Sequence, residues 1–549
     1  MNRRSTGRRS TGAARLGDGL TALCGGALAC SILLVVGLLI VLAVNGLGCF
    51  WQRPLLRVEL DDGTVLLGEV QGREPIPETI GAAAGAARMR LEVGNRDVDG
   101  RDFVWVDEPR VVAHEYPADA ILLERLEWGN FYGTPLELRR GADLLARGPA
   151  QVWQSFGPLH RRKLADLAAV RRLERKEIGD VNHRIEQLRL AQRALAAADL
   201  PEAERSRRAR ALDGERAAAE ATYETLTQRL FALRDELDAE RLVVQTVQGE
   251  SREIPVSSIA RAVQPNRLGT PAKLGLYAER VWEFVTDQPR ESNTEGGIFP
   301  AIFGTVMMVF IMSFAVSPLG VLAALYLREY ARQGPLVHLV RIAVHNLAGV
   351  PSIVFGVFGL GFFVYLIGGT LDRLFYAEAL PSPTFGTGGI LWASLTLALL
   401  TVPVVIVATE EGLAAVPRVV REGSLALGAT KFETTWRVVL PAAAPGIMTG
   451  LILAMARAAG EVAPLMIVGM VKLAPALPID GRFPFVHFER KFMHLGFHVY
   501  DVGFQSPNIE ATKPIVFATA LVLIAVVTGM NLIAIGLRNR LRSRCSSSN

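Results

Sequence analysis

Cysteine is scarce in this sequence, with four residues among 549. Their number and spacing argue against a disulfide framework and against a zinc site. Cys24 and Cys30 fall inside one apolar run, Cys49 stands at the far edge of that run, and Cys545 lies near the end of the chain. This spacing matches neither a disulfide framework nor a zinc site. We therefore expect the cysteines to be small buried or interfacial residues.

The sequence also lacks a strong excess of charge and a phosphate-binding loop. A formal net charge of +5 is modest for 549 residues and gives no argument for nucleic-acid binding. The pattern G-x-x-x-x-G-K-[S/T] does not occur, so the chain carries no P-loop nucleotide site. Hydrophobic residues make up 50% of the chain, yet charged residues still reach 21%. That mixture is typical of membrane spans joined to a soluble, charged part.

Six long apolar runs are present, and each can cross a bilayer, which takes roughly 20 residues. The runs are Leu20–Val44, Phe299–Leu327, Leu347–Gly369, Gly388–Ala408, Pro445–Met470 and Pro514–Leu537. The first run is too long for the core of a signal peptide and lacks a clear small-residue cleavage site. We therefore expect six transmembrane helices, with the first one retained.

Basic residues gather beside alternate ends of these runs. The four groups are Arg3, Arg4, Arg8, Arg9 and Arg15; Arg328, Arg332 and Arg341; Arg418, Arg421, Lys431 and Arg437; and Arg538, Arg540, Arg542 and Arg544. Six alternating crossings place all four groups on one side of the membrane, and basic residues favour the cytoplasmic side. The sequence therefore predicts cytoplasmic N- and C-termini and an external position for residues 45–298.

Residues 51–290 form an insert between the first two runs, and both ends of this insert have β character. The stretch RVELDDGTVLLGEV alternates apolar and polar residues around Asp62-Gly63, which is a signal for a β-hairpin. Further short strand patterns predict β structure over residues 52–150 and 242–266.

The middle of the insert, residues 158–241, is rich in Ala, Leu, Glu and Arg, with apolar residues at heptad spacing. The two series are Ile178, Val181, Ile185, Leu188 and Leu195, and Ala219, Tyr223, Leu226, Leu230, Leu233 and Leu237. Pro201 separates them, which predicts an antiparallel coiled-coil hairpin and an α+β insert. Two roles stay open for the hairpin: a spacer or self-association surface, and a docking site for an external partner.

A charged stretch, REGSLALGATKFETTWRVVLP (Arg421–Pro441), joins the fourth and fifth runs. Pro417 suits the first turn of a helix, and Gly428 can end that helix in a left-handed conformation. Thr430 and Glu433 have the spacing of a capping box, which predicts the start of a second helix. The stretch is therefore expected to form two helices around a tight glycine turn.

The second of these helices carries an apolar and aromatic stripe. Phe432, Trp436 and Val439 recur at helical spacing, and Pro441 is expected to end the helix. Such a stripe is buried either against the protein's own spans or in a groove on a cytosolic partner.

The spacing of this stretch resembles the EAA loop of ABC-transporter permeases, E-A-A, three residues, G, nine residues, I-x-L-P. Here the intervals read Glu422-Gly423-Ser424, then Gly428, then Val438-Val439-Leu440-Pro441. The departures are Gly423 and Ser424 for alanines and Val438 for isoleucine. In that family the loop forms a coupling helix on a separate ATPase subunit, which binds ATP and Mg. The resemblance implies a loop over 409–441 with coupling residues Glu422, Gly423, Ser424, Gly428, Phe432, Trp436, Leu440 and Pro441.

Three further stretches, NTEGGIFPAIFGT, PSIVFG and GIMTGLILAMARAAGEVAPLM, resemble the phosphate-transport permease of the PstA type. This resemblance covers about residues 1–50 and 290–549. It implies an all-α membrane protein like a type I ABC permease, with the first transmembrane helix in 1–50, five more in 291–549, and the insert as an addition that compact members lack.

The same resemblance implies the setting of the chain. It predicts a bacterial inner-membrane permease that imports phosphate, with no cofactor bound by this chain. The implied partners are the lipid bilayer, a homologous PstC-like permease, a PstB-like ATPase dimer and a periplasmic PstS-like phosphate-binding protein.

Arg457 and Glu461 lie four residues apart in the fifth run, so a continuous helix places them on one face. A charge within a span costs roughly 2.5–3.5 kcal/mol on insertion scales and normally faces a pore or a partner charge. A guanidinium matches a tetrahedral oxyanion by bidentate bonding. The pair is either a self-compensating structural pair or part of a translocation site, and the resemblance supports the second. Geometry alone does not separate phosphate from sulfate.

Other polar clusters give weaker signals. His487, His494 and His498 lack a clear third partner for metal binding, and Glu410 with Glu411 suits the interfacial end of a helix. No set of paired catalytic residues stands out, so an enzyme is not expected. The alternative to a permease is a membrane-anchored scaffold or phosphate-sensing component that works through its coiled coil.

Overall fold

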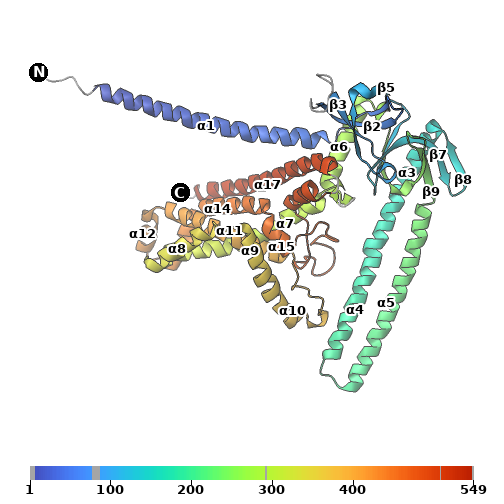
Figure 1. The fold of residues 1–549 in the computed structure, drawn as a ribbon. Helices are drawn as coiled ribbons and strands as arrows, with labels where there is room; N and C mark the ends of the chain where they lie inside the picture. The colour runs from blue at the N-terminus through green and yellow to red at the C-terminus, as the bar shows by residue number, and fades with distance from the viewer. Residues whose placement is uncertain (1–6, 77–86, 291–292, 507–508, 547–549) are drawn as a thin grey trace.

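The computed structural model describes residues 7–76, 87–290, 293–506 and 509–546. A bundle of apolar helices forms a core, and a β-rich insert with a long helical hairpin projects from one end of it (Figure 1). The described residues contain six helical segments long and apolar enough to cross a membrane: Thr21–Gly48, Phe299–Tyr330, Ser352–Phe375, Ile390–Ala415, Lys431–Gly460 and Ala511–Arg540. The predicted number of spans is confirmed.

The core is built around α11 (Ile390–Ala415), which packs against α7 (Phe299–Leu325) and α14 (Leu440–Gly460). These helices bury apolar side chains against one another and form the largest apolar cluster of the core. α11 and α14 approach closely at Gly412 and Gly446, where a Cβ added to Gly446 would lie 2.6 Å from the Cα of Gly412. Small residues are needed at such a backbone contact between helices.

The first span stands apart from the rest of the core. α1 (Gly7–Gly48) is exposed over most of Thr21–Gly48 and packs near its end against α17 (Ile509–Ser546). The contact is tightest at Gly46, where an added Cβ would lie 2.8 Å from the backbone nitrogen of Ala518. Figure 1 shows α1 leaving the bundle beyond this contact.

Shorter elements complete the core. They are α6 (Thr270–Thr286), η5 (Pro265–Arg267), β12 (Pro289–Arg290), β13 (Glu295–Gly296), η7 (Tyr326–Tyr330), α8 (Pro335–Leu347), α9 (Ser352–Phe358), η8 (Gly359–Gly368), α10 (Gly369–Phe375), η9 (Ala377–Ala379), α15 (Ala463–Val468), α16 (Leu495–Tyr500) and η11 (Asp501–Gln505). α9, η8 and α10 follow one another directly and together form the third span.

The bounds of all six spans differ from those of the predicted runs, and two of the differences have a clear cause. The third begins at Ser352, because the separate helix α8 already ends at Leu347. The fifth does not reach Met470: α14 ends at Gly460. Pro464 explains this end, since it has no N–H to donate to the Gly460 carbonyl four residues earlier.

The described residues of the insert form two antiparallel sheets. The first has the order β4-β3-β2-β1-β5, and the second has the order β10-β9-β7-β6-β11 with β8 beside β7. The strands are β1 (Leu55–Leu60), β2 (Val65–Pro75), β3 (Ala87–Glu92), β4 (Phe103–Asp107), β5 (Val111–Glu115), β6 (Ile121–Arg125), β7 (Asn130–Arg140), β8 (Asp143–Arg147), β9 (Glu240–Gln245), β10 (Ser251–Pro255) and β11 (Ile259–Val263). The predicted hairpin turn is present, with Gly63 at φ +79° between β1 and β2.

Short helical turns connect these strands. They are α2 (Arg96–Asp99), η2 (Glu108–Arg110) and η4 (Val256–Ser258).

Two long antiparallel helical arms project from the second sheet. The first arm is α3 (Pro149–Arg172), the π-helical η3 (Leu173–Ile178) and α4 (Gly179–Ala197), and the second is α5 (Glu202–Leu237). The arms meet at the turn that Pro201 predicts, but the first begins at Pro149, before the heptad pattern becomes visible. Coiled-coil packing along the whole hairpin stays a prediction.

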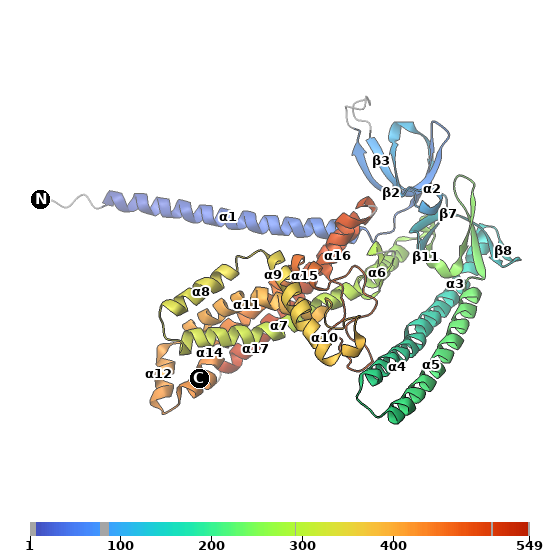
Figure 2. The same ribbon diagram turned by 60° about the horizontal axis from the view of Figure 1, so that its bottom comes forward.

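The hairpin contacts the core as well as the sheet. Asp180 of α4 pairs with Arg482, with 2.9 Å between Oδ1 and Nε, and Arg193 donates to the Leu380 carbonyl at 3.2 Å. α4 contacts η9, the turn that follows α10, and Figure 2 shows the end of the hairpin near this part of the core. The insert is therefore connected to the core at two places, its β sheets and its hairpin.

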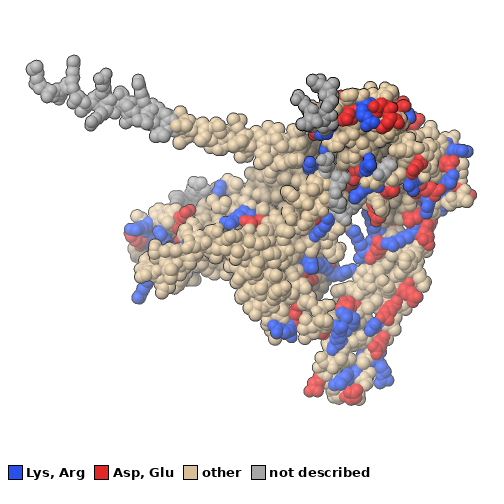
Figure 3. Space-filling view, viewed as in Figure 1, with Lys and Arg blue, Asp and Glu red and all other residues tan. Residues whose placement is uncertain are grey.

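Charged side chains follow this division of the molecule. Figure 3 shows lysine, arginine, aspartate and glutamate gathered over the insert, the hairpin and the opposite end of the core. The surface between these ends carries few charges, as expected of a surface that faces lipid.

Candidate functional site

The stretch between α11 and α14 forms two helices around a glycine turn, as predicted. α12 (Arg418–Ala426) follows Pro417, which stands at the N-cap rather than within the first turn. Gly428 has a φ of +88°, so the chain leaves α12 in a left-handed conformation.

The capping box that opens the second helix is also present. Thr430 Oγ1 accepts a hydrogen bond from the Glu433 N–H at 3.2 Å, and Glu433 Oε2 accepts one from the Thr430 N–H at 3.0 Å. These bonds satisfy two backbone donors that the helix leaves free.

The prediction that Pro441 ends this helix is wrong. α13 (Lys431–Glu433), the π-helical η10 (Thr434–Val439) and α14 follow one another without a break, and Pro441 lies in the first turn of α14. A proline here removes a helical hydrogen bond, and the wider π turn before it accommodates that loss. The glycine turn therefore leads straight into the fifth span.

Polar contacts fix α12 to the core and to the helix that follows it. The Arg421 guanidinium donates to Glu329 Oε1 at 3.1 Å and to the Val416 carbonyl at 2.6 Å. The hydroxyls of Ser424 and Thr434 lie 2.9 Å apart and connect the two helices. Sequence reasoning gave Arg421 no such role, because its partner Glu329 lies 92 residues away and no local pattern joins them.

An apolar surface remains exposed on this stretch. The side chains of Phe432 and Trp436 are 64% and 52% exposed, and their rings stack with centroids 6.1 Å apart. Leu427 is 91% exposed and Val419 77%. We call these four residues the docking surface. Val439, expected on the same stripe, is buried in the core instead.

The other residues that the resemblance marks for coupling surround this surface. Glu422, Gly423, Gly428 and Pro441 are exposed, and Leu440 is half-buried against the cluster that contains Val439. A Cβ added to Gly423 or Gly428 would meet no atom within 4 Å.

Arg457 and Glu461 meet, although not on one helix. Arg457 lies in the last turn of α14, and Glu461 follows the helix in an extended conformation. Their side chains still form an ion pair, with 3.5 Å between Nε and Oε1. Both are partly exposed, so this end of α14 presents a guanidinium and a carboxylate side by side.

The three histidines have separate surroundings. His487 lies between Asp480 and Glu489, at 3.0 and 3.1 Å. His494 caps α16 by accepting from the Gly496 N–H. His498 lies 3.3 Å from the Thr519 hydroxyl. Burial lowers the pKa of His494 and His498 to about 4, so both are neutral at neutral pH.

The two neighbouring carboxylates at the end of α11 also diverge. Glu410 pairs with Arg341 of α8 at 3.2 Å, whereas Glu411 is exposed. The pairing joins α8 to α11 and gives Glu410 a structural role.

Comparison with known proteins gives a consistent set of relatives. Residues 316–545 match the family model described as binding-protein-dependent transport system inner membrane component. The phosphate transport system permease protein PstA of Mycobacterium leprae is 32% identical over 281 residues, which are 50% of this chain and 81% of the relative. The probable phosphate transport system permease protein PstA of Methanocaldococcus jannaschii is 31% identical over 257 residues, 46% of this chain and 78% of the relative.

Solved structures resemble the chain more distantly. A chain of the inward-facing MetNI methionine ABC transporter has 17% sequence identity and a TM-score of 0.33, with 44% of this chain and 94% of that chain covered. A chain of a bacterial ABC transporter for alginate import has 12% identity and a TM-score of 0.33, with 49% and 89% covered.

Proposed function

Because the chain belongs to the family of binding-protein-dependent transport system inner membrane components, we propose that it is the permease subunit of an ABC importer for inorganic phosphate. The observation that carries this proposal is the identity of 31–32% to phosphate permeases over about four fifths of their length. Six apolar helices make it a multi-pass membrane protein, in keeping with this family.

The docking surface is the proposed contact with a separate ATPase, which would bind ATP and Mg. The side chains of Phe432 and Trp436 expose large apolar areas to solvent. A groove on a partner would bury these rings. Arg421 joins α12, which carries part of this surface, to Glu329 of the core. Through this contact a movement of the docking surface would be transmitted to the core. Glu422, Gly423, Ser424, Gly428, Leu440 and Pro441 complete the proposed coupling loop.

Arg457 and Glu461 form the proposed contact with phosphate. The Arg457 guanidinium can bind two phosphate oxygens, and charge-assisted bonds of this kind are among the stronger hydrogen bonds. Glu461 holds the guanidinium in the unloaded state, because the two side chains already form an ion pair. Phosphate would then compete with the Glu461 carboxylate for Arg457.

The orientation of the chain in the membrane is part of the proposal. The docking surface and both termini would be cytoplasmic, and the insert would lie in the periplasm of a bacterium. α1 begins, and α17 ends, on the α12 side of the molecule in Figure 1. A PstC-like permease, a PstB-like ATPase dimer and a PstS-like binding protein are the proposed partners.

ATP-driven uptake in proteoliposomes tests this function. The chain is reconstituted with its second permease, ATPase and binding protein, and uptake of labelled phosphate and labelled sulfate is measured with and without ATP. We expect ATP-dependent uptake of phosphate well above that of sulfate. A preference for sulfate would assign another oxyanion, and ATP hydrolysis without uptake of either would contradict the permease function.

A further inference from the structure

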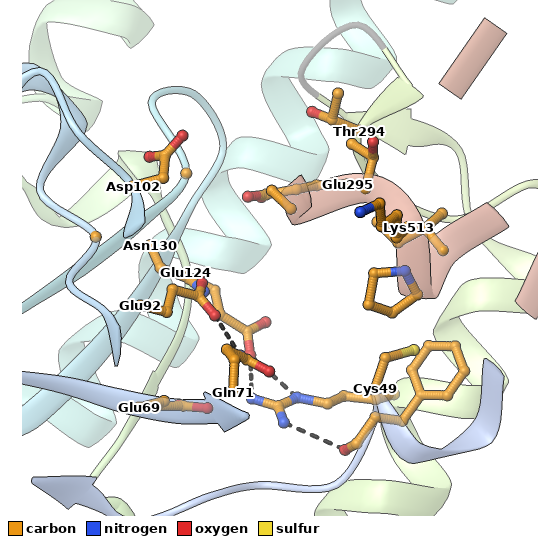
Figure 4. Close-up of a pocket in the computed structure, with 18 of the residues that line it drawn as sticks. Cys49, Glu69, Gln71, Glu92, Asp102, Glu124, Asn130, Thr294, Glu295 and Lys513 are labelled. Carbon is orange, nitrogen blue, oxygen red and sulfur yellow. Dashed lines mark hydrogen bonds and ion pairs between the residues drawn. The ribbon is translucent and has the colours of Figure 1, made fainter. Parts of the chain in front are cut away.

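A cavity of about 760 Å³ lies where the insert meets the core (Figure 4). Strands β2 and β3 of the first sheet contribute one wall, and α6 contributes another. The end of α1 and the start of α17 close it from the core side. We call it the seam cavity. Its volume falls within the range of small-molecule sites.

The wall of the seam cavity is rich in cations. Its cationic side chains are Arg53, Arg90, Arg96, Arg261, Arg280, Arg290 and Lys513, and its carboxyl side chains are Glu69, Glu92, Asp102, Glu124, Glu283 and Glu295. Part of this charge is compensated internally. Glu124 pairs with Arg261 at 2.8 Å and with Arg280, and Glu283 pairs with Arg261 at 2.7 Å and with Arg290 at 3.0 Å.

Two of the carboxyls differ from the others. Glu69 and Glu92 lie opposite each other on β2 and β3. Their hydrogen-bond partners are amides: Gln52 donates to Glu69 at 2.8 Å, and Gln71 and Asn130 donate to Glu92. Such partners add no compensating charge.

The pKa values of these two carboxyls are raised above the ordinary value for glutamate. Burial raises the pKa of Glu69 to about 8, with Glu92 adding to the shift and Arg280 of α6 and Arg53 opposing it. Burial raises the pKa of Glu92 as well. When both are protonated, seven cations face four carboxylates in this wall, and the cavity favours an anion.

Two of the cations are available for a ligand. The side chains of Arg96 and Lys513 are exposed and make no hydrogen bond or ion pair within the described part of the chain. Arg96 comes from the insert and Lys513 from α17. In Figure 4, Lys513 lies across the opening from Glu69 and Glu92. An anion between these walls would contact insert and core together.

We propose that the seam cavity binds a phosphate group through cations supplied by both the insert and the core. Guanidinium and ammonium groups suit a phosphate by charge-assisted hydrogen bonds. The source is free phosphate or the headgroup of an anionic lipid, since Val44 and Phe517 from two apolar helices also line the cavity. Arg457 is not among the lining residues, so this site is additional to the proposed transport contact.

Binding to the purified full-length complex tests the proposal. Inorganic phosphate binding is measured by equilibrium dialysis, and retention of phosphatidylglycerol by native mass spectrometry. The double variant Arg96→Ala/Lys513→Ala is compared with Lys273→Ala, which removes an α6 cation outside the cavity. Arg457→Ala is included in both variants and in the reference, so that the transport contact does not contribute.

We expect the double variant to weaken one of the two probes by about tenfold, which corresponds to 1.4 kcal/mol, and Lys273→Ala to leave both unchanged. Loss of phosphate identifies the free anion, and loss of the lipid alone identifies a headgroup. Unchanged binding of both probes would overturn the proposal. Failure of phosphate uptake with seam binding intact would count against the proposed transport function and not against this site.

A pH series examines the charge balance of the wall. Glu69→Gln keeps the position neutral at any pH, whereas the native carboxyl becomes charged as pH rises through about 8. Between pH 7 and 9, we expect the affinity of the reference protein for the bound probe to fall relative to that of Glu69→Gln. Comparing the two proteins at the same pH removes the contribution of the probe's own titration. Identical profiles would overturn the electrostatic basis of the site.

Discussion

Among single residues, Arg457 offers the most direct test of the proposed pathway. Arg457→Ala removes the guanidinium that pairs with Glu461 and leaves this carboxylate without its partner in the proposed pathway. We expect phosphate uptake to fall by at least about tenfold, as for the loss of one charge-assisted bond pair, while the complex still assembles. Arg457→Lys restores the charge without the bidentate geometry and should recover part of the uptake. Normal uptake by Arg457→Ala would rule out the proposed role.

Glu69 makes a separate prediction about stability. Its pKa is about 8 in the folded chain against an ordinary value of 4.5, so the unfolded chain releases this proton first as pH rises. The free energy of unfolding should therefore fall with rising pH between about 4.5 and 8. Glu69→Gln should flatten that fall. Thermal unfolding of the insert from pH 5 to 9 measures it, with the exposed Glu59→Gln as control. The prediction is wrong if the stability of Glu69→Gln and that of Glu59→Gln fall equally as pH rises.

Residue-level patterns predicted the turn between α12 and α13 well, because the interactions that form it are local. Gly428 and the capping box of Thr430 and Glu433 involve neighbours within a few residues, and both are present. Arg421 and the ion pair of Glu410 depend on partners far along the chain, and no local spacing reveals them.

At the scale of elements, Gly428 and Gly423 form a matched pair for mutation. Both have open space around an added Cβ, but Gly428 alone has a positive φ. Gly428→Val should strain the turn by roughly 1–2 kcal/mol and displace α12. Gly423→Ala should be tolerated, since alanine favours a helix. We expect ATPase copurification to fall for the first and persist for the second. Retention by both would argue against the coupling loop.

The docking surface makes an element-scale prediction of its own. Phe432→Ala and Trp436→Ala each remove an exposed ring, and we expect each to lower the affinity for the ATPase by about ten- to a hundredfold, as at interface hot spots. Phe314→Ala is the control, because this side chain on α7 is 85% exposed on the apolar part of the core. Equal effects from all three would indicate a general loss of folding.

Helix ends were harder to predict than helices. The continuation through Pro441 depends on the π turn before it, and a run of apolar residues does not indicate such a turn. The early end of α14 follows from Pro464, whose effect a hydropathy pattern hides. The first arm of the hairpin starts at Pro149 because Val152 and Phe156 pack into the core of the second sheet, and a heptad count misses that packing.

On the scale of the whole molecule, the hairpin can be separated from transport. Replacing residues 182–217 by a short glycine turn removes the outer part of both arms and retains α3, which packs on the second sheet. We expect assembly and phosphate uptake to persist within about twofold, since neither proposed working site lies in the hairpin. Loss of uptake would make the hairpin part of the transporter, and loss of phosphate sensing alone would favour the scaffold alternative.

The sequence predicted six spans and an external insert because hydropathy and charge extend over whole segments. It did not predict the position of α1 beside α17, or the seam cavity. Both arise from contacts between segments hundreds of residues apart, such as Gly46 with Ala518.

The uninterrupted helical path from Lys431 to Gly460 has a mechanical consequence. Phe432 and Arg457 lie near its two ends, separated by roughly 40 Å at 1.5 Å per residue. A loop between them would absorb a displacement, but a stiff helix passes axial movement from one end to the other. An ATP-driven displacement of Phe432 along the helix axis would therefore move Arg457 by about the same amount.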